Sequence, residues 1–438
     1  MNWSHLPDLA AVALLVCAFA SVTRRSHTPV SGIWLTGWLM ILVHFFFGLF
    51  RPAPGVGGIL LSTVVLSSLT WAGVLFMSAT VSYIHEKSSQ WMRGTLLATN
   101  TLYIALLLPE HVPLWALNSA AALLGLGPLA VVFFGRVGFK PFLRRAILLL
   151  YASLSIFVLI VQNRGGAELA LNAVLFTVYL GCCVHFWHTY RRSTAGAFVT
   201  IAGFFAWAMV FVAAPLMGAF FPKIAVESEV WNLPKYVVAV GMILLLLEDQ
   251  IEHNKYLALH DELTGLANRR LFQDRLATAL ERSRRTQTQT ALLLIDLDRF
   301  KHVNDTLGHY VGDLLLQHVG NAFTGRVRRS DTVARTGGDE FAIILEDPTS
   351  RADALRVGES LLQLLDHPID LDRHTVQIGA SLGVAIFPED AGDGESLRIT
   401  ADLRMYEHKN RKRSQSEDPV GAQSGAEPNE IACDADVL

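Results

Sequence analysis

The chain has 438 residues, of which 52% are hydrophobic and only 17% are charged, a composition too apolar for an ordinary soluble protein. Its charge is unevenly distributed, because residues 1–247 contain 14 Lys and Arg against 6 Asp and Glu, whereas residues 248–438 contain 22 against 33. The acidic C-terminal half argues against a nucleic-acid partner, which usually binds a basic face. The four cysteines have no CxxC spacing and indicate neither a disulfide framework nor a zinc site.

Apolar segments long enough to cross a bilayer recur throughout residues 1–247, since a spanning helix needs about 20 mainly apolar residues. The first is a membrane span and not a cleaved signal peptide, because Arg24 and Arg25 follow it and no basic region precedes it. Pro109–Pro113 separates the fourth segment from the fifth, so eight or nine spans are predicted. The nine segments are 8–22, 32–50, 58–81, 94–109, 112–134, 145–161, 168–187, 196–221 and 231–247.

Loop charges predict the orientation of this all-α membrane region. With the N-terminus outside, ten Lys and Arg lie on the inner side and four on the outer side, which satisfies the positive-inside rule. Everything after Leu247 is then cytoplasmic. The membrane is predicted to be the inner (plasma) membrane, whose lipid the spans contact. The inner residues are Arg24, Arg25, Lys87, Arg93, Arg136, Lys140, Arg144, Arg145, Arg191 and Arg192. The outer residues are Arg51, Arg164, Lys223 and Lys235.

Inside the spans, Cys182, His185 and His188 are three residues apart and share a helix face, with His44 as a further candidate. Polar groups within membranes are often functional, so a metal or haem site is one interpretation. Histidines that pack near a span end are the other. The signal sensed by this region is not legible from the sequence.

Residues 248–260 follow the last span without Gly or Pro and predict a helix that continues into the cytoplasm. Leu247, Ile251, Asn254 and Leu257 repeat at spacings of three and four, which suits either pairing with a second subunit or packing on the chain's own domain.

Residues 261–413 alternate helical segments with buried strands and predict an α/β or α+β sandwich with one sheet. The aliphatic strand Thr290–Ile295 ends on Asp296, and the segment Gly337-Gly338-Asp339-Glu340 forms the tip of a hairpin. The two glycines are expected to supply positive φ angles and to let a bulky anion approach the backbone. Paired carboxylates beside a bare turn suit Mg²⁺ and a nucleotide, although the same four residues also make an ordinary solvated turn.

The runs Asp296–Asp313 and Arg335–Phe341 resemble the signature of GGDEF-domain diguanylate cyclases, and the resemblance covers about residues 261–413. Asp261–Arg270 and Ala380–Pro388 are also similar to that family. Its members condense two GTP into cyclic di-GMP, with one GTP held on each of two facing domains. The resemblance therefore implies a homodimer with a nucleotide-cyclase-like fold that uses Mg²⁺ or Mn²⁺.

The roles of individual residues follow from this resemblance. Asp296, the Leu297 carbonyl and Asp339 would hold the metal, with Asp339 and Glu340 as the catalytic acids. The residues implied in GTP binding are Asn304 and Asp313 for the guanine, and Lys301, Gly337, Gly338, Lys409 and Arg413 for the phosphates. Arg328 and Asp331 match the family's inhibitory site for cyclic di-GMP, with a second arginine at Arg351 or Arg356.

Three of these assignments keep a simpler alternative. Arg328 and Asp331 are also compatible with a surface ion pair, and the basic run Lys409–Arg413 with a solvated helix end. This last helix departs from the family at His408 and Lys412, where small residues are usual. Residues 414–438 are polar and acidic and are predicted to be a disordered tail.

Three functions remain as hypotheses. The first is a membrane-anchored diguanylate cyclase regulated by its spans and by its product. The second is a non-catalytic receptor for GTP or cyclic di-GMP. The third is a nucleotide-gated transporter, against which the few charges within the spans and the lack of an inverted repeat argue.

Overall fold

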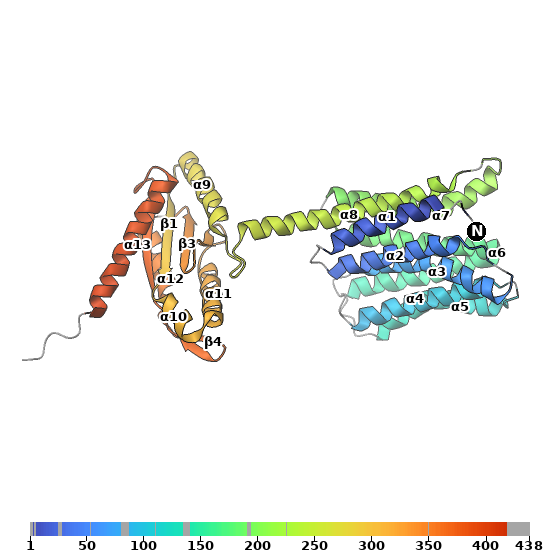
Figure 1. Cartoon of the computed structure of the whole chain (residues 1–438), viewed down its shortest axis with the longest axis horizontal. Helices are drawn as coiled ribbons and strands as arrows, with labels where there is room; N and C mark the ends of the chain where they lie inside the picture. The colour runs from blue at the N-terminus through green and yellow to red at the C-terminus, as the bar shows by residue number, and fades with distance from the viewer. Residues whose placement is uncertain are drawn as a thin grey trace, which may run out of the picture. The chain divides into compact units, whose positions relative to one another are not determined.

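The structure is a computed structural model of the chain. It describes residues 3, 6–24, 29–52, 54–79, 87–109, 111–134, 141–190, 194–224, 226–348 and 350–417. The chain folds into two compact units, Met1–Glu252 and His253–Leu438 (Figure 1).

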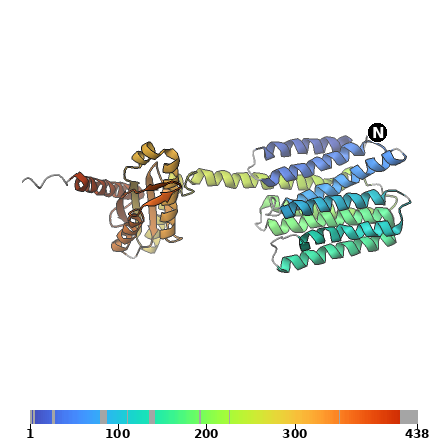
Figure 2. The same cartoon turned by 90° about the horizontal axis from the view of Figure 1, so that it is seen from below.

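The first unit is built from helices alone in its described residues, and consecutive helices from α1 to α7 pack against one another (Figure 2). Gly166 has a φ of 81° and breaks α6, so that its two parts correspond to the sixth and seventh predicted spans. Glycine alone adopts this left-handed geometry without strain. The helices are α1 (Leu6–Thr23), α2 (Pro29–Gly48), α3 (Val56–Ser78), α4 (Lys87–Leu107), α5 (Leu114–Phe134), α6 (Pro141–Thr189), α7 (Ala195–Phe220) and α8 (Ser228–Leu259).

Six helical segments in the described part of the chain are long and apolar enough to cross a membrane. This number is lower than the eight or nine predicted spans, partly because α4 carries many polar residues. The two or three further spans that the sequence indicates stay a prediction. The six segments are Leu6–Thr23, Val30–Gly48, Val56–Ser78, Gly166–Thr189, Ala195–Phe220 and Glu229–Leu259.

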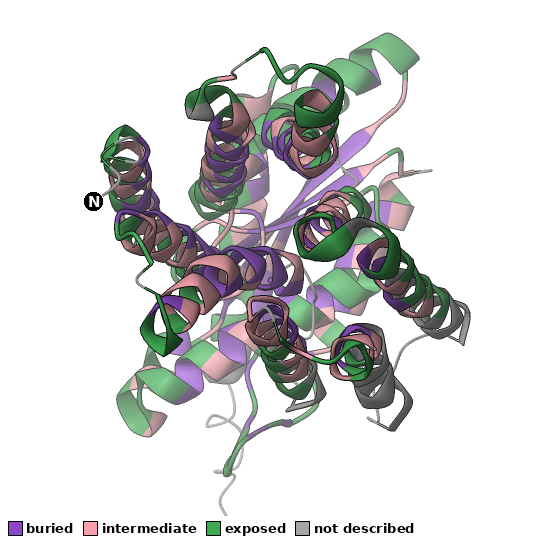
Figure 3. Cartoon of the chain, turned by 90° about the vertical axis from the view of Figure 1, so that its right-hand side faces the viewer, coloured by how far each residue is buried: buried purple, intermediate pink, exposed green. Residues whose placement is uncertain are grey.

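Aromatic side chains fill the core of this unit. Tyr179 stacks on Trp207 with ring centroids 4.0 Å apart, and Trp34 stacks on Phe186 at 5.6 Å. Helices α7 and α8 approach closely because Gly241 has no side chain, and a Cβ there would lie 2.6 Å from the backbone nitrogen of Thr200. Figure 3 views the helices of the first unit end-on and shows buried and exposed residues on different sides of the helices.

Lys235, a predicted outer-loop cation, lies within a helix, as Arg164 does. It is buried inside α8, only 7% exposed, and donates to the side chain of Asn232. Asn232 in turn donates to Asp8 at 2.6 Å, and Tyr236 donates to Asp8 at 2.8 Å. A buried ammonium needs such polar partners. Asn232 and Tyr236 therefore join α8 to α1, and Lys235 binds to this group from within the helix.

The face of Cys182 and His185 contains no metal site among the described residues, where no group of three or more His, Cys, Asp or Glu is placed to hold an ion. The Cys182 thiol is buried and donates to the carbonyl of Gly73 at 3.2 Å. His44 contacts the carbonyl of Val65 at 2.7 Å. Helix packing is thus the interpretation that fits the contacts of Cys182 and His44.

Helix α8 continues through residues 248–259 without interruption, as the sequence predicts for the connector. Ile251 is 52% exposed and Leu257 39% exposed. This exposure leaves the predicted pairing with a second subunit open.

The second unit is built around a sheet of order β2-β3-β1-β6 in which all neighbours are antiparallel. This arrangement makes the domain α+β. A second, two-stranded sheet of β4 and β5 corrects the prediction of a single sheet. The strands are β1 (Thr290–Leu297), β2 (Thr332–Arg335), β3 (Glu340–Glu346), β4 (Ile369–Leu371), β5 (His374–Val376) and β6 (Ala380–Phe387).

Helices cover both faces of the larger sheet, so its central strands are apolar on both sides. Alternate residues such as Leu293 and Ile343 pack in one core with α11 and α12. Their neighbours Leu292 and Ile344 pack in another core with α9 and α13. The helices are α9 (Arg269–Thr286), α10 (Phe300–Leu307), α11 (His309–Arg326), α12 (Arg351–Gln363) and α13 (Gly394–Glu417).

Helix α13 ends later than predicted. It runs to Glu417, so the first four residues of the predicted disordered tail are helical. The rest of that tail, residues 418–438, lies outside the described residues.

Candidate active site

Two carboxylate residues from separate parts of the sequence meet where β1 pairs with β3. Asp296 is opposite Glu340 in the register, and the backbone N–H of Leu297 donates to the carbonyl of Asp339 at 3.2 Å. Strand β1 extends to Leu297, one residue past Asp296, on which the strand was predicted to end. The pairing places Asp339 at the hairpin tip directly beside the last residues of β1.

The hairpin tip between β2 and β3 is closed by the N–H of Thr336, which donates to the carbonyl of Glu340 at 3.0 Å. The expected positive φ angles are absent at Gly337 and Gly338, both of which the structure describes. The second expectation fits better, because a Cβ at Gly338 would meet nothing within 4 Å. The backbone is therefore open to an approaching group at Gly338.

The guanidinium of Arg335 stabilises the hairpin tip through hydrogen bonds. Its Nε and Nη2 donate to the carbonyl of Gly338 at 3.1 and 2.9 Å, and its Nη1 donates to both oxygens of Asp261 at 3.0 and 3.2 Å. Burial alone would raise the pKa of Asp261, but hydrogen bonds from Thr264 and Arg335 together lower it. Sequence reasoning gave Arg335 no role, although its position beside the Gly-Gly pair could have drawn attention to it.

The acids of this site carry an unbalanced negative charge. Burial and the nearby Asp296 carboxylate raise the pKa of Asp339. The ammonium of Lys409 on α13 donates to Asp296 at 2.5 Å, and this bond raises the pKa of Lys409. A cation is therefore already present at Asp296, while Asp339 has carboxylate neighbours.

The two departures from the family pattern, His408 and Lys412, both contact β6. The N–H of Leu382 donates to Nδ1 of His408 at 3.1 Å, and Lys412 donates to the carbonyl of Ala380 at 2.5 Å. Lys412 also lies 3.5 Å from Asp298. Because β6 is an edge strand, its outward groups need such partners, and these bonds fix α13 beside the acids.

Asp298 is a residue that sequence reasoning did not single out. Its carboxylate accepts from the hydroxyl of Ser381 at 2.7 Å, and its N–H donates to the carbonyl of Gly379 at 2.8 Å. It stands two residues after Asp296, in the turn that follows β1. That spacing was the available signal.

Asn304 on α10 lies against Gly312 on α11, the residue that precedes Asp313. A Cβ at Gly312 would lie 1.9 Å from Oδ1 of Asn304, so the amide of α10 fits against α11 only because residue 312 has no side chain. Asp313 follows at once and is exposed. An amide that donates and accepts and an acceptor carboxylate therefore lie on adjoining turns.

Lys301 and Arg413, the remaining candidates, occupy different helices. Lys301 lies in the first turn of α10 and Arg413 near the end of α13, and both are exposed. Lys409, the other cation of α13 implied in phosphate binding, contacts the acid Asp296 at 2.5 Å.

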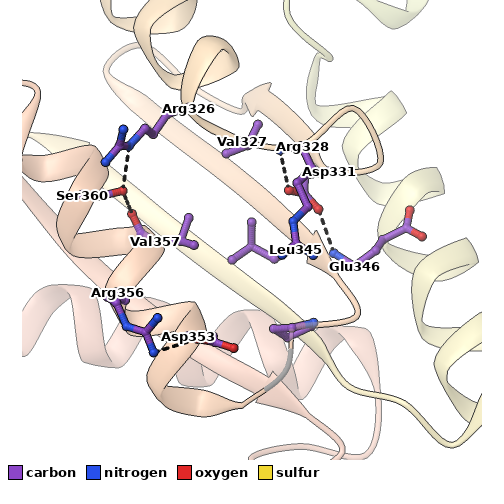
Figure 4. A pocket seen from close by; sticks show the side chains of 11 residues that line it. Arg326, Val327, Arg328, Asp331, Leu345, Glu346, Asp353, Arg356, Val357 and Ser360 are labelled. Carbon is purple, nitrogen blue, oxygen red and sulfur yellow. Dashed lines mark hydrogen bonds and ion pairs between the residues drawn. The ribbon is translucent and has the colours of Figure 1, made fainter.

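A pocket of about 380 Å³ lies away from the hairpin tip, between α12 and the start of β2 (Figure 4). Asp331 accepts from the N–H of Arg328 at 2.8 Å and from the N–H of Glu346 at 3.2 Å. Arg356 lines this pocket and pairs with Asp353 at 2.8 Å. Arg326 lines the pocket as well, whereas Arg351 pairs with Glu389 and Asp390.

Residues 258–415 match the family model described as the GGDEF domain of diguanylate cyclases. This segment is a GGDEF domain. The domain takes its name from the residues Gly337-Gly338-Asp339-Glu340-Phe341. The first three form the hairpin tip, and Glu340 and Phe341 begin β3.

Relatives of the GGDEF domain carry related names. The diguanylate cyclase TpbB of Pseudomonas aeruginosa is 42% identical over 168 residues, which cover 38% of this chain and 39% of TpbB. MucR of the same organism, named a bifunctional diguanylate cyclase and cyclic di-GMP phosphodiesterase, is 39% identical over 193 residues, which cover 41% of this chain and 28% of MucR. This chain thus spans less than two fifths of the length of either relative.

One solved structure, the isolated GGDEF domain of TpbB, is 42% identical to this chain. The match covers 35% of this chain and 89% of that chain, with a TM-score of 0.34.

Proposed function

We propose that the chain is a membrane-bound diguanylate cyclase, which condenses two GTP into cyclic di-GMP and releases two pyrophosphates. The GGDEF match and the relatives named as cyclases support this proposal. The observation that carries it is the pairing of β1 with β3, which sets Asp296 beside the hairpin tip with Asp339. The intact tip favours catalysis over the alternative of a non-catalytic receptor.

A divalent cation fits the donor set at this place. The carboxylates of Asp296 and Asp339, together with the carbonyl of Leu297, would hold Mg²⁺ or Mn²⁺, which prefer hard oxygen ligands. The raised pKa of Asp339, caused by burial and by Asp296, is the mark of neighbouring carboxylates that lack enough positive charge. When bound, the ion would neutralise charge at the α-phosphoryl group and acidify the attacking 3′-hydroxyl.

The chain's own residues position the substrate and move the proton. Asp339 is placed to accept the proton of the 3′-hydroxyl, with Glu340 beside it as the second acid. Asn304 and Asp313 would bind the edge of the guanine, whose N1 and N2 groups donate to a carboxylate.

The triphosphate would lie along the bare backbone of the tip. Gly337 and Gly338 leave room there, and a Cβ at Gly338 would meet no atom within 4 Å. The cations that would face the phosphates are Lys301, Lys409 and Arg413. Such contacts supply charge and position at once.

A single domain holds one GTP, so the reaction needs two hairpins face to face. We therefore assign the active form to a homodimer. The exposed Ile251 and Leu257 of the connector, 52% and 39% exposed, offer an apolar stripe through which two copies could pair. The membrane region would control when the two half-sites meet.

The pocket of Figure 4 suits the product as an inhibitor. Arg328 and Asp331 would bind a guanine of cyclic di-GMP, since a guanidinium can donate two parallel bonds. Arg356 lines the same 380 Å³ pocket and would add a second guanidinium. The site is separate from the hairpin tip, as feedback inhibition requires.

The location we propose is the inner (plasma) membrane, with the N-terminus outside and the GGDEF domain cytoplasmic. Six candidate spans support membrane insertion, and the loop charges support the orientation. Arg25, Arg136, Lys140, Arg191 and Arg192, which contribute to that charge count, lie outside the described residues.

The test is turnover by the purified full-length chain in lipid nanodiscs with GTP and Mg²⁺. Cyclic di-GMP and pyrophosphate are expected in a ratio of one to two, and Asp339→Ala should abolish both. Cyclic di-GMP made by Asp339→Ala at the wild-type rate would contradict the assignment of Asp339. Binding of GTP without turnover by a confirmed dimer would favour the receptor.

A further inference from the structure

Lys409 contacts one of the carboxylates of the candidate active site. Its ammonium lies 2.5 Å from Oδ1 of Asp296, the carboxylate that the proposed function assigns to the metal. The side chain of Asp296 is only 14% exposed, so water screens this pair less than a surface pair. A protein cation therefore sits where a divalent ion would be expected to bind.

A divalent ion at Asp296 would lie within a few ångströms of this ammonium. A carboxylate has about four lone-pair positions, so both cations could be accommodated sterically. Their mutual repulsion is the obstacle, because it lowers the affinity for a free ion about tenfold or more even at the dielectric constant of water. The pair with Lys409 thus opposes metal binding as long as it stays intact.

The side chain of Lys409, and not its helix, is the part that can move. Helix α13 is fixed to β6 by the bonds of Lys412 to Ala380 and of His408 to Leu382. The Lys409 side chain is 43% exposed and carries four flexible methylenes. A triphosphate offers it a larger negative charge than one carboxylate does.

We propose that Lys409 is a resident counter-ion that keeps free Mg²⁺ or Mn²⁺ out of the site until a nucleoside triphosphate takes the lysine away. Metal and nucleotide then enter together, and Asp296 has a cationic partner in both states. This inference rests on the metal site of the proposed function but not on turnover.

The test measures metal binding without catalysis. The full-length chain in nanodiscs is titrated with MnCl₂ and no nucleotide, and free Mn²⁺ is followed by electron paramagnetic resonance. Each variant is also measured with Asp296→Asn added. The Mn²⁺ binding that Asp296→Asn removes is assigned to this site, and the binding that remains is assigned to other acidic residues. The Kd for Mn²⁺ at this site should be about tenfold lower or more in Lys409→Met than in the wild type. At Mn²⁺ concentrations that fill the site in Lys409→Met, the wild type should show no binding there.

Two variants control for charge and helix position. Lys409→Arg keeps the positive charge and should bind Mn²⁺ as weakly as the wild type. Lys412→Met removes the same charge from the same helix, but its partner is Asp298 at 3.5 Å, and it should gain much less affinity than Lys409→Met. Equal gains from both substitutions would overturn the proposal, since net charge alone would then explain them.

A second titration adds a non-hydrolysable GTP analogue. The wild type should now bind Mn²⁺ at the site, whereas Lys409→Met should need about tenfold more analogue. A merely structural ion pair would not make metal binding tighter and nucleotide binding weaker in one variant. Wild-type binding of Mn²⁺ that is equally tight with and without the analogue would refute the proposal. Absence of cyclic di-GMP synthesis would remove the proposed function but leave these titrations unaffected.

Discussion

Replacing Arg335 with Met should loosen the hairpin tip and slow catalysis together. The guanidinium makes four contacts of 2.9–3.2 Å to the Gly338 carbonyl and the Asp261 carboxylate. Its side chain is 14% exposed. Hydrogen bonds to charged groups contribute about 1.5–3 kcal/mol each, but bonds from one side chain are not additive. We expect a loss of about 2–3 kcal/mol in the local stability of the hairpin.

The assay is hydrogen exchange of backbone amides in peptides covering 332–346 of the full-length chain. A loss of about 2–3 kcal/mol corresponds to exchange faster by roughly 30- to 150-fold for amides that exchange by local opening. The turnover rate should fall about 100-fold, because a displacement of about 1 Å at a catalytic group has that effect. Arg335→Lys keeps the positive charge but loses the planar guanidinium that binds two partners at once. Its amide exchange rate and its turnover rate should lie between those of Arg335→Met and the wild type.

Arg282→Met is the matched control. Arg282 also bonds a carboxylate next to β3, Glu346 at 2.7 Å, but it is 61% exposed and lies at the far end of the strand. Exposed pairs contribute about 0–1 kcal/mol, so exchange and turnover should stay near wild type. Our reasoning on the tip is refuted if Arg335→Met exchanges and turns over like Arg282→Met.

Three further results are expected. Gly312→Ala should raise the KM for GTP about tenfold or more because its Cβ would displace the neighbouring amide, whereas Gly325→Ala on the same helix meets nothing within 4 Å and should leave KM unchanged. Asp390→Asn should lower the free energy of unfolding by about 2–3 kcal/mol at pH 7. Because bonds from Arg404 hold the pKa of Asp390 well below its usual range, this difference should persist above pH 4 and shrink as the pH falls further. Arg328→Ala should raise the concentration of cyclic di-GMP needed for half-inhibition about tenfold or more, and unchanged inhibition would remove that site.

The sequence predicted the fold of the C-terminal unit well because its signals are local. The aliphatic run of β1 and the amphipathic α9 both appear where the patterns place them. The second sheet was missed because β4 and β5 have three residues each, too few for a periodic pattern. In the N-terminal unit, Lys235 looked like a loop charge because Asn232, the side chain that binds it, is itself held by Asp8, which is 224 positions from Asn232 in the sequence.

The candidate site was predictable to a different degree for each residue. Asp339 and its hairpin stand out because turn residues and acids are adjacent in the sequence. The contact of Asn304 with Gly312 depends on how two helices pack, and it becomes visible only as the 1.9 Å approach that a Cβ would make. The role of Arg335 also depends on folding, because Asp261 and Gly338 meet through one guanidinium.

The departures at His408 and Lys412 explain why a family pattern underdetermines a single member. Small residues at these positions would leave the N–H of Leu382 and the carbonyl of Ala380 to other partners. Here an imidazole and an ammonium bind these groups directly, and the same helix presents Lys409 to Asp296. The substitutions therefore act on the site through the position of α13. Replacing His408 with Ala should shift Lys409 and so alter metal affinity before it alters the chemical step.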